Sequence, residues 1–372
     1  IERVAVIGAG TMGGGIAMNF LNAGLPVTML EMKPDALDRG VATMRKNYES
    51  QVKKGKLKQD KYEGRMALLK TTLAYDDIKD ADLVIEAVFE DMGVKEKVFK
   101  TLDEVMKPGA ILASNTSTLD VNRIAEGIPH PDRLLGLHFF SPAHIMRLVE
   151  IIRADATSDD TLALAHGLAA QLGKIPVAAG ICDGFIGNRI LTRYRQSTDI
   201  LLLEGALPWQ VDRAMQDFGM AMGPYAVQDL SGLDIAYASR QRLKLRDDPA
   251  HRYIPVADRL VEGLQRLGRK TGAGWYDYPD GKPVPSPVVT GIIEAASAEA
   301  GLMRRVFSAT EIQDRALTAM VDEACRILDE GIAARPSDID LVMVHGYAFP
   351  RWRGGLMHYA DGVGLNVFLD RV

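Results

Sequence analysis

A glycine-rich turn near the start of the chain constrains its fold more than any other feature. Residues 4–7 are apolar and fit a buried parallel strand, and Gly8, Gly10 and Gly13 follow with the spacing G-x-G-x-x-G. This pattern is typical of a strand–turn–helix unit in which the backbone approaches a pyrophosphate at the helix N-terminus. The sequence therefore predicts a dinucleotide-binding domain. The alternative is a corner without a ligand, since glycine-rich turns also form for purely steric reasons.

An acidic residue at the end of the second predicted strand indicates which dinucleotide is preferred. The apolar residues 26–30 end in Glu31, which lies 18 residues beyond Gly13. Folds of this kind place an acidic residue near that position, on the adenosine ribose. A carboxylate there accepts hydrogen bonds from the ribose hydroxyls and repels a 2′-phosphate. The sequence therefore favours NAD over NADP.

The length and composition define the class of protein. A chain of 372 residues is long enough for two or three domains. Its 47% hydrophobic and 25% charged residues are ordinary values for globular proteins. A formal charge of −5 argues against nucleic acid as the main partner. The lack of an apolar run of about 18 residues argues against integral membrane association.

The two cysteines are too few for a disulfide framework. Cys182 and Cys325 also lack metal-ligand spacing, so no metal is expected. This usage favours an intracellular, reducing compartment, and we expect the bacterial cytoplasm rather than a peroxisome or mitochondrion. Because the chain begins at Ile1 without an initiator Met, we also expect it to be a piece of a longer protein.

Strands alternate with helices through the next residues. Residues 81–88 and 109–115 fit buried strands, and residues 92–106 between them fit a helix. This alternation predicts an α/β Rossmann-type doubly wound parallel sheet, which binds ligands at the carboxyl ends of its strands. The polar residues at those ends, which we expect to face the cofactor, are Glu90, Asn115 and Ser117.

Two later strand-like runs are apolar except for one ionisable residue well inside each run. Residues 134–140 contain His138, and residues 147–152 contain Glu150. An ionised carboxylate in an apolar strand is costly to bury without a partner. If the strands are neighbours, Glu150 fixes the imidazole tautomer and leaves the other ring nitrogen to take a proton from substrate. The alternative is a pair that merely satisfies itself in the core.

The strand–helix alternation ends with a last predicted strand at residues 174–179, and an all-α region follows Phe185. The helical region repeats itself with a constant offset of 126 positions, which indicates an internal duplication. The matching pairs are Ile186/Ile312, Arg189/Arg315, Leu191/Leu317, Thr192/Thr318, Leu202/Leu328, Glu204/Glu330, Gly205/Gly331, Asp212/Asp338 and Pro224/Pro350. We therefore predict an NAD-binding domain at 1–182, a first helical copy at 183–295 and a second at 296–372. The second copy carries Asp314 where the first has Asn188, and it is predicted to be structural.

Three polar residues each have two interpretations. Asn188 is either a helix cap or packing residue, or it donates to a substrate carbonyl. Lys54 lies in the basic tail of a helix predicted over residues 33–58, which is either a solvated face or an arm for an anionic substrate. Lys270, in a glycine-rich loop, either approaches the cofactor or stays in water.

Six motifs, taken together, are more specific than the glycine turn alone. GAGTMGGGIA, EAVFED, SNTSTL, GLHFFSPAHIMRLVEII, GFIGNRIL and GRKTGAGWYDY occur in this order over essentially the whole chain. In this they resemble the L-3-hydroxyacyl-CoA dehydrogenases. HFFSPAH and the second helical copy look like the dehydrogenase half of the multifunctional fatty-acid β-oxidation enzymes, whose other half is an enoyl-CoA hydratase/isomerase.

The resemblance implies NAD-dependent oxidation of an acyl-CoA substrate, (3S)-3-hydroxyacyl-CoA, to 3-ketoacyl-CoA. It also implies a chain fused to or associated with other β-oxidation activities. Because duplicated helical units can pack together in place of the dimer contact of single-unit relatives, we expect a monomeric pseudo-dimer. Two rival classes are a dehydrogenase of a free hydroxy acid or sugar acid and a non-catalytic NAD-binding relative.

The resemblance also implies roles for single residues. His138 matches the family's catalytic histidine and Glu150 its carboxylate partner. Ser117 and Asn188 match residues that hold the substrate oxygen, and Lys54 falls where a helical arm contacts CoA. The positions expected to contact NAD are Gly8, Gly10, Thr11, Met12, Gly13, Glu31, Val88, Glu90, Lys95, Asn115, Ser117, Ser141 and Lys270. The chain departs from many members, which have Asp in place of Glu31, and from single-function members with Asn in place of Ser141.

Overall fold

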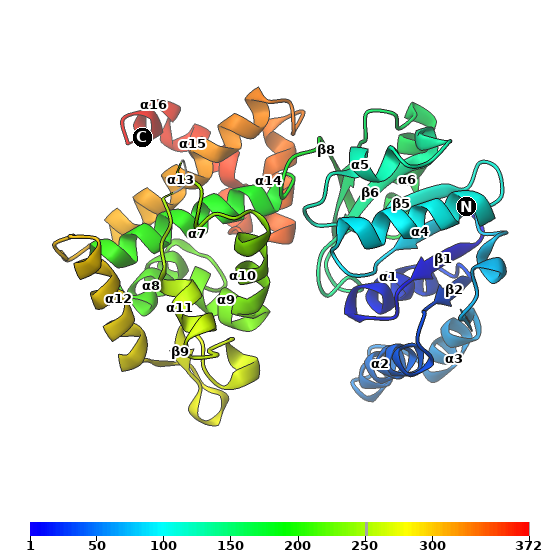
Figure 1. The fold of residues 1–372 in the computed structure, drawn as a ribbon, viewed down its shortest axis with the longest axis horizontal. Helices are drawn as coiled ribbons and strands as arrows, with labels where there is room; N and C mark the ends of the chain where they lie inside the picture. Colours follow the sequence, from blue (N-terminus) through cyan, green and yellow to red (C-terminus); the bar gives the residue numbers. More distant parts are fainter. Residues whose placement is uncertain (250–251, 372) are drawn as a thin grey trace. The chain divides into compact units, whose positions relative to one another are not determined.

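The computed structural model describes residues 1–249 and 252–371, and the chain forms two compact units (Figure 1). The first unit contains Ile1–Arg189 and Arg326–Tyr347, and the second contains Ile190–Cys325 and Ala348–Val372. These units differ from the predicted parts 1–182, 183–295 and 296–372, because part of the second helical copy belongs to the first unit.

An eight-stranded sheet with the strand order β3-β2-β1-β4-β5-β6-β7-β8 forms the centre of the first unit. The strands are β1 (Val4–Ile7), β2 (Val27–Leu30), β3 (Leu69–Thr72), β4 (Leu83–Glu86), β5 (Ile111–Ser114), β6 (Leu134–Phe139), β7 (Leu148–Ile152) and β8 (Ile175–Ala179). Strands β1 to β6 run parallel, β7 is antiparallel to β6, and β8 is parallel to β7. The predicted architecture is therefore confirmed, with β7 and β8 reversed relative to the other strands.

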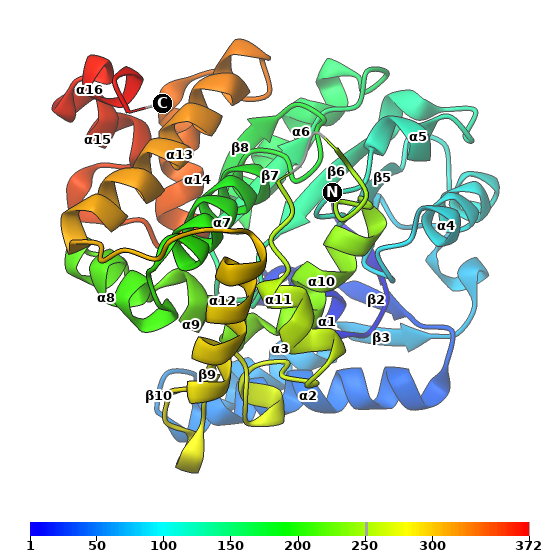
Figure 2. The same cartoon turned by 60° about the vertical axis from the view of Figure 1, so that its left-hand side comes forward.

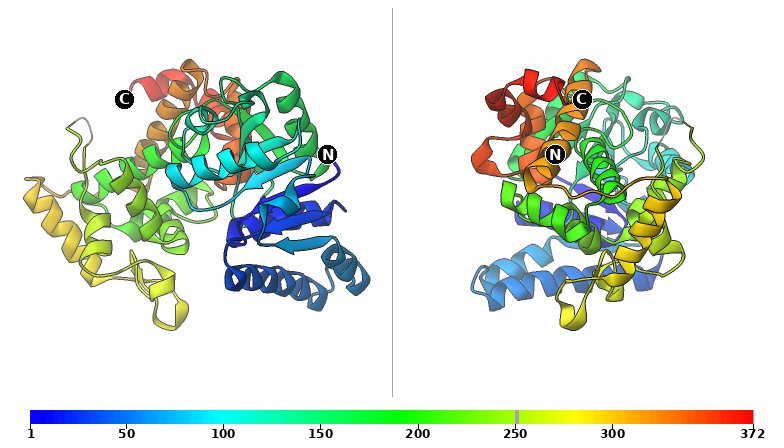
Figure 3. Two further views of the ribbon diagram at one scale, coloured as in Figure 1. Left: turned by 45° about the vertical axis from the view of Figure 1, so that its right-hand side comes forward. Right: turned by 90° about the vertical axis from the view of Figure 1, so that its left-hand side faces the viewer.

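Helices of the first unit connect and cover these strands. They include α1 (Thr11–Asn22), α2 (Pro34–Lys53), α3 (Gln59–Ala67), α4 (Met92–Val105), α5 (Val121–Ala125), α6 (Asp159–Gln171) and α14 (Pro336–Gly346). The helix predicted over residues 33–58 is confirmed as α2 but ends earlier than predicted, at Lys53, and α3 is a separate helix; both are drawn in blue (Figure 3). Gly55 between them has a φ of +68°, a left-handed conformation that only glycine adopts without strain.

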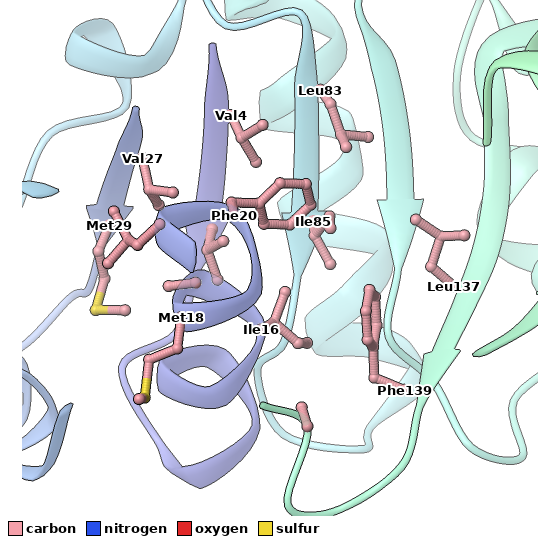
Figure 4. Packing of buried hydrophobic residues seen from close by; sticks show 14 of the residues in the cluster. Val4, Ile16, Met18, Phe20, Val27, Met29, Leu83, Ile85, Leu137 and Phe139 are labelled. Carbon is pink, nitrogen blue, oxygen red and sulfur yellow. The ribbon is translucent and has the colours of Figure 1, made fainter. Parts of the chain in front are cut away.

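The core of the first unit fixes the glycine-rich turn in place (Figure 4). Ile16 and Phe20 on α1 are fully buried and belong to one cluster with Val4, Val27 and Ile85 on the sheet. Each such side chain stabilises the fold by about 1.5–3 kcal/mol relative to leaving it exposed. Helix α1 is therefore held against β1, with its N-terminus at the carboxyl end of that strand.

The second unit is mainly helical (Figure 2). Its elements are α8 (Pro208–Phe218), α9 (Pro224–Ser231), α10 (Leu233–Arg242), α11 (Val256–Glu262), α12 (Pro287–Glu299), α15 (Leu356–Val363) and α16 (Leu365–Leu369), with most of α7 (Gly187–Glu204) and α13 (Ala309–Asp329). Trp275 and Tyr225 are fully buried in its core, and their ring centroids are 4.6 Å apart. These rings anchor the loop before residue 276 to α9.

A short hairpin departs from the all-α prediction for the chain after Phe185. Strand β9 (Tyr276–Asp277) pairs antiparallel with β10 (Val284–Pro285). The carboxylate of Asp229 on α9 accepts hydrogen bonds from the backbone N–H groups of Trp275 and Tyr276, at 2.8 and 3.0 Å. Strands of two residues are too short to produce an alternating sequence pattern, so the prediction missed them.

Equivalent helices and ion pairs recur in the two helical copies. At an offset of 126 residues, α7 and α8 correspond to α13 and α14. Within the first unit Arg189 pairs with Glu330, and within the second unit Arg315 pairs with Glu204. Each pair joins an arginine of one copy to a glutamate of the other, which is the reciprocal pattern of a two-fold interface.

Across the residues that the structure describes, no helix has the length and apolar character needed to cross a membrane.

Candidate active site

The glycine-rich turn leaves open space where a phosphate group would lie. A Cβ on Gly8 would lie 2.6 Å from the carbonyl oxygen of Ala87, and one on Gly13 would lie 1.9 Å from the carbonyl oxygen of Gly8. A Cβ on Gly10, in contrast, would meet nothing within 4 Å. Two glycines are thus required by close backbone packing, and the third opens the turn.

The N-terminus of α1 would attract a negative charge placed in this space. The helix begins at Thr11 and Met12, no side chain caps its N-terminus, and its first turn carries no acidic residue. Its free N–H groups and the positive end of its dipole therefore remain available to an anion. The turn fits the pyrophosphate of a dinucleotide.

Glu31 lies at the carboxyl end of β2, beside the turn. Its Oε2 accepts a hydrogen bond from the N–H of Ala9 at 3.0 Å, and its Oε1 accepts one from the N–H of Met32 at 2.7 Å. These contacts hold the carboxylate next to the glycine-rich turn, the position expected for a ribose contact.

A buried ion pair lies under the end of β4. Lys95 on α4 and Glu86 on β4 are both fully buried, with Nζ 2.7 and 2.9 Å from the two carboxylate oxygens. The N–H of Val88 donates to the same carboxylate at 2.7 Å. Lys95 therefore supports the backbone at Val88, and its ammonium is enclosed by protein groups.

Glu90 organises the loop that carries Ser117. Its Oε1 accepts hydrogen bonds from the Thr116 hydroxyl at 2.6 Å and from the N–H and hydroxyl of Ser117 at 2.8 and 3.2 Å. Burial opposes ionisation of Glu90, but the Lys95 ammonium and the hydrogen bonds outweigh it and lower the pKa of this carboxyl below its ordinary value. An ionised carboxylate thus fixes the position of Ser117.

Asn115 connects β5 to β6. Its Oδ1 accepts a hydrogen bond from the N–H of Phe139 at 3.0 Å, and its own N–H donates to the carbonyl of Glu86 at 2.8 Å. The residue closes the carboxyl end of the sheet beside His138.

His138 and Glu150 form the predicted pair. They are directly opposed in the β6–β7 register, both are buried, and the imidazole Nδ1 lies 2.6 Å from Oε2 of Glu150. The other carboxylate oxygen, Oε1, accepts from the N–H of Gly187 at 3.0 Å. A carboxylate oxygen only accepts hydrogen bonds, so this contact fits an imidazole tautomer with a proton on Nδ1.

Asn188 lies one residue beyond that anchor. Its Nδ2 donates to the carbonyl oxygen of Ser117 at 3.4 Å, and its Oδ1 accepts from the hydroxyl of Tyr347 at 2.8 Å. The structure therefore brings Asn188 and Ser117 together within the first unit.

Two of the remaining predicted contacts are exposed in the first unit, and the third belongs to the second unit. Ser141 is exposed in the turn after β6, and Lys54 is exposed at the end of α2. Lys270 belongs to the second unit, where its ammonium pairs with Asp234 at 2.6 Å. Within the described ranges, no group of His, Cys, Asp or Glu is suited to hold a metal ion.

Sequence patterns missed three residues of this cluster. Glu86 begins the EAVFED motif but was given no role, and Phe140 reads as an ordinary core residue although its ring centroid lies 4.3 Å from that of His138. Tyr347 is 159 residues from Asn188 along the chain. It has no equivalent in the first copy, where the offset of 126 leads to Ala221.

Both halves of the chain match one protein family. Residues 3–182 match the NAD-binding domain of 3-hydroxyacyl-CoA dehydrogenase, and residues 184–278 and 312–371 match its C-terminal domain. The repeated C-terminal match agrees with the duplication found in the sequence.

Named relatives are multifunctional enzymes of peroxisomes and glyoxysomes. The chain is 40% identical to the peroxisomal bifunctional enzyme of Danio rerio, covering 100% of this chain and 53% of that protein. It is 37% identical to the glyoxysomal fatty acid beta-oxidation multifunctional protein MFP-a of Brassica napus, covering 100% and 52%. The chain thus spans about half the length of these relatives. Their names do not favour the bacterial cytoplasm expected from the sequence.

Solved structures of dehydrogenases have the same fold. A 3-hydroxybutyryl-CoA dehydrogenase from Escherichia coli K12 is similar with a TM-score of 0.85 at 26% identity, covering 99% of this chain and 93% of that one. The dehydrogenase part of multifunctional enzyme 1 from C. elegans has a TM-score of 0.67 at 31% identity, covering 94% and 79%. With both domains matched, this chain belongs to the 3-hydroxyacyl-CoA dehydrogenase family.

Proposed function

We propose that this chain oxidises (3S)-3-hydroxyacyl-CoA to 3-ketoacyl-CoA with NAD, as the dehydrogenase part of a multifunctional β-oxidation enzyme. The observation that carries the proposal is the 2.6 Å contact between His138 and Glu150 on neighbouring strands, with Asn188 and Ser117 in the same unit. The family membership and the relatives' greater length support it.

In this proposal, Nε2 of His138 removes the proton of the substrate hydroxyl. Glu150 stabilises the resulting imidazolium through Nδ1 and keeps the ring oriented. The amide of Asn188 and the hydroxyl of Ser117 hold the substrate oxygen, while Glu90 fixes Ser117. NAD, when bound at the glycine-rich turn, supplies the acceptor for the C3 hydride.

Cofactor selectivity rests on Glu31 in this proposal. Glu31 accepts from the ribose hydroxyls, and the turn from Gly8 to Gly13 with Thr11 and Met12 holds the pyrophosphate. Val88 and Asn115 line the cofactor side, and Lys95 acts from beneath through Glu86. Ser141 and Lys270 complete the proposed cofactor contacts, and Lys54 is proposed to meet the phosphates of CoA.

We also propose that the chain is a monomer, in which the two helical copies form an internal pseudo-dimer. The reciprocal pairs Arg189–Glu330 and Arg315–Glu204 support this proposal. Each helical copy then has the other copy as its partner within one chain.

The test of the reaction uses two variants, one expected to lower turnover and the other to weaken NAD binding. For His138→Gln we expect turnover with acetoacetyl-CoA and NADH, the reverse reaction, to fall about 10²- to 10⁴-fold, because the general acid–base group is lost. NAD affinity, measured by calorimetry, stays near the wild-type value.

For Glu31→Ala we expect weaker NAD binding and a smaller preference for NAD over NADP.

The control is His130→Gln, since His130 is an exposed histidine of the same unit and lies outside the site. It leaves turnover unchanged. Near-normal turnover of His138→Gln would exclude His138 as the base. NADH formation from a free hydroxy acid, with indifference to CoA thioesters, would replace the proposed substrate class by the rival one.

A further inference from the structure

We infer that Tyr347, which the second helical copy supplies, is a positioning residue that fixes the side-chain amide of Asn188 for the reaction. The inference rests on the proposed function, because Asn188 is proposed there to hold the substrate oxygen. It gives the second copy a part in catalysis beyond the structural role predicted from the sequence.

The hydrogen bonds of Asn188 define which way its amide faces. The hydroxyl of Tyr347 donates to Oδ1 at 2.8 Å, and Nδ2 donates to the carbonyl oxygen of Ser117 at 3.4 Å. A carbonyl oxygen only accepts, so the flipped amide would set Oδ1 against it and lose that contact. The carbonyl of Ser117 thus selects the orientation, with Nδ2 on its side, and the Tyr347 hydroxyl, which can donate or accept, holds the amide in place from Oδ1.

Close packing against its neighbours fixes the position of the Tyr347 ring. Tyr347 follows α14, which packs on β7 and β8, the strand of Glu150 and its neighbour. A Cβ on Gly187 would lie 2.2 Å from the Tyr347 ring, and one on Gly346 would lie 2.7 Å from Leu148. The absence of side chains at these two glycines lets the ring approach the start of α7.

The same ring also contacts the groups around the proposed base. The rings of Tyr347 and Phe140 meet edge to face with centroids 5.6 Å apart, and Phe140 lies against His138. The backbone N–H of Gly187, under the Tyr347 ring, donates to Glu150. One side chain from the second copy therefore supports both the amide of Asn188 and the packing of the His138–Glu150 pair.

The first copy shows that the fold does not require a tyrosine at this place in the repeat. The residue 126 positions before Tyr347 is Ala221, in the corresponding turn after α8. Tyr347 lies in the first unit together with Asn188, whereas Ala221 belongs to the second unit.

The test removes the hydroxyl and keeps the ring. For Tyr347→Phe we expect kcat to fall about three- to tenfold, the effect of one hydrogen bond, with the KM for NADH unchanged. The matched control is Tyr359→Phe in the second copy, whose ring packs against Phe218 and Phe349. We expect this control to keep wild-type kcat.

A double-mutant cycle with Asn188→Ala distinguishes positioning from a general loss of structure. If Tyr347 acts through Asn188, Tyr347→Phe lowers kcat in the wild-type background and not in the Asn188→Ala background. An equal fold-loss in both backgrounds, or wild-type kcat for Tyr347→Phe, would overturn the inference.

The cycle also separates this inference from the proposed function. A wild-type chain without activity on acetoacetyl-CoA would remove the proposed reaction. The same four proteins are then compared by urea unfolding. Coupling between the two substitutions supports the fixed amide, and additive effects contradict it.

Discussion

At the scale of single residues, Asp212 shows how one buried carboxylate joins three elements. It lies on α8 and accepts from the N–H groups of Tyr225 and Ala226 at the start of α9, and from the hydroxyl of Tyr276 on β9. Burial, helped by the nearby Asp229 carboxylate, raises the pKa of Asp212 from 3.8 to about 6, although these hydrogen bonds act to lower it. The carboxylate is therefore costly to keep ionised in the folded state.

A raised pKa links this residue to the pH dependence of stability. The folded state binds the proton more tightly than the unfolded state, so the stability that Asp212 contributes is fully present below pH 3.8 and is lost as the pH rises through about 6. Asp212→Asn cannot titrate. We expect the difference in free energy of unfolding, wild type minus variant, to fall by about 1 kcal/mol between pH 5 and pH 7.5.

The measurement is urea unfolding at both pH values. The control is Asp217→Asn, which changes a more exposed carboxylate on the same helix. For this variant we expect the same difference in free energy of unfolding from the wild type at both pH values. A wild-type minus Asp212→Asn difference that grows with pH would reverse the assigned pKa shift.

The contact between His138 and Glu150 could be predicted because each is an ionisable residue inside an apolar strand. An ionisable residue in each of two apolar runs was enough to predict that His138 and Glu150 pair, and the structure shows this contact. Their roles in a reaction stay predictions. The partners of Lys95 and Asn188 were not predicted. Glu86 is an ionisable residue in an apolar run, so the signal that identified His138 and Glu150 could have found it, whereas Tyr347 lies 159 residues from Asn188 and carries no local pattern.

At the scale of elements, α1 contains adjacent glycines with different requirements. A Cβ on Gly13 would overlap the carbonyl oxygen of Gly8, whereas one on Gly14 would make ordinary contact with Met44 at 3.5 Å. We expect Gly13→Ala to destabilise the protein by about 1–3 kcal/mol, because the backbone must move. Gly14→Ala should stabilise it by up to about 1 kcal/mol through helix propensity.

Urea unfolding compares the two variants, and calorimetry reports whether each still binds NAD. We expect Gly13→Ala to weaken NAD binding and Gly14→Ala to retain it. If the two alanines had equal effects, close packing at the turn would not be the reason for Gly13.

Strands with buried, apolar sequences were predictable, and the exposed, polar strand was not. The runs that became β1, β4, β5 and β6 are wholly buried, so their apolar sequences identified them. The edge strand β3 has the sequence LKTT and is partly exposed, which leaves no pattern to detect. The break between α2 and α3 depends on the left-handed conformation of Gly55. The many basic residues of that stretch are compatible with a helix, so the sequence did not predict the break.

At the scale of the whole molecule, the duplication leads to a prediction about assembly. Because the two helical copies already make reciprocal ion pairs within the chain, we expect light scattering to give the mass of a single chain, 40.6 kDa. A stable dimer would contradict the proposed internal pseudo-dimer.

The position of α14 on β7 and β8 also has a consequence for synthesis on the ribosome. The sheet is complete once β8 has been made, but the helix that covers its last two strands comes from residues 336–346. At about 5–20 residues per second, translation takes roughly ten to thirty seconds to reach Tyr347 after β8. Over that interval the surface of β7 and β8 that α14 covers has no partner helix, so we expect chaperones to bind the nascent chain during this part of its synthesis.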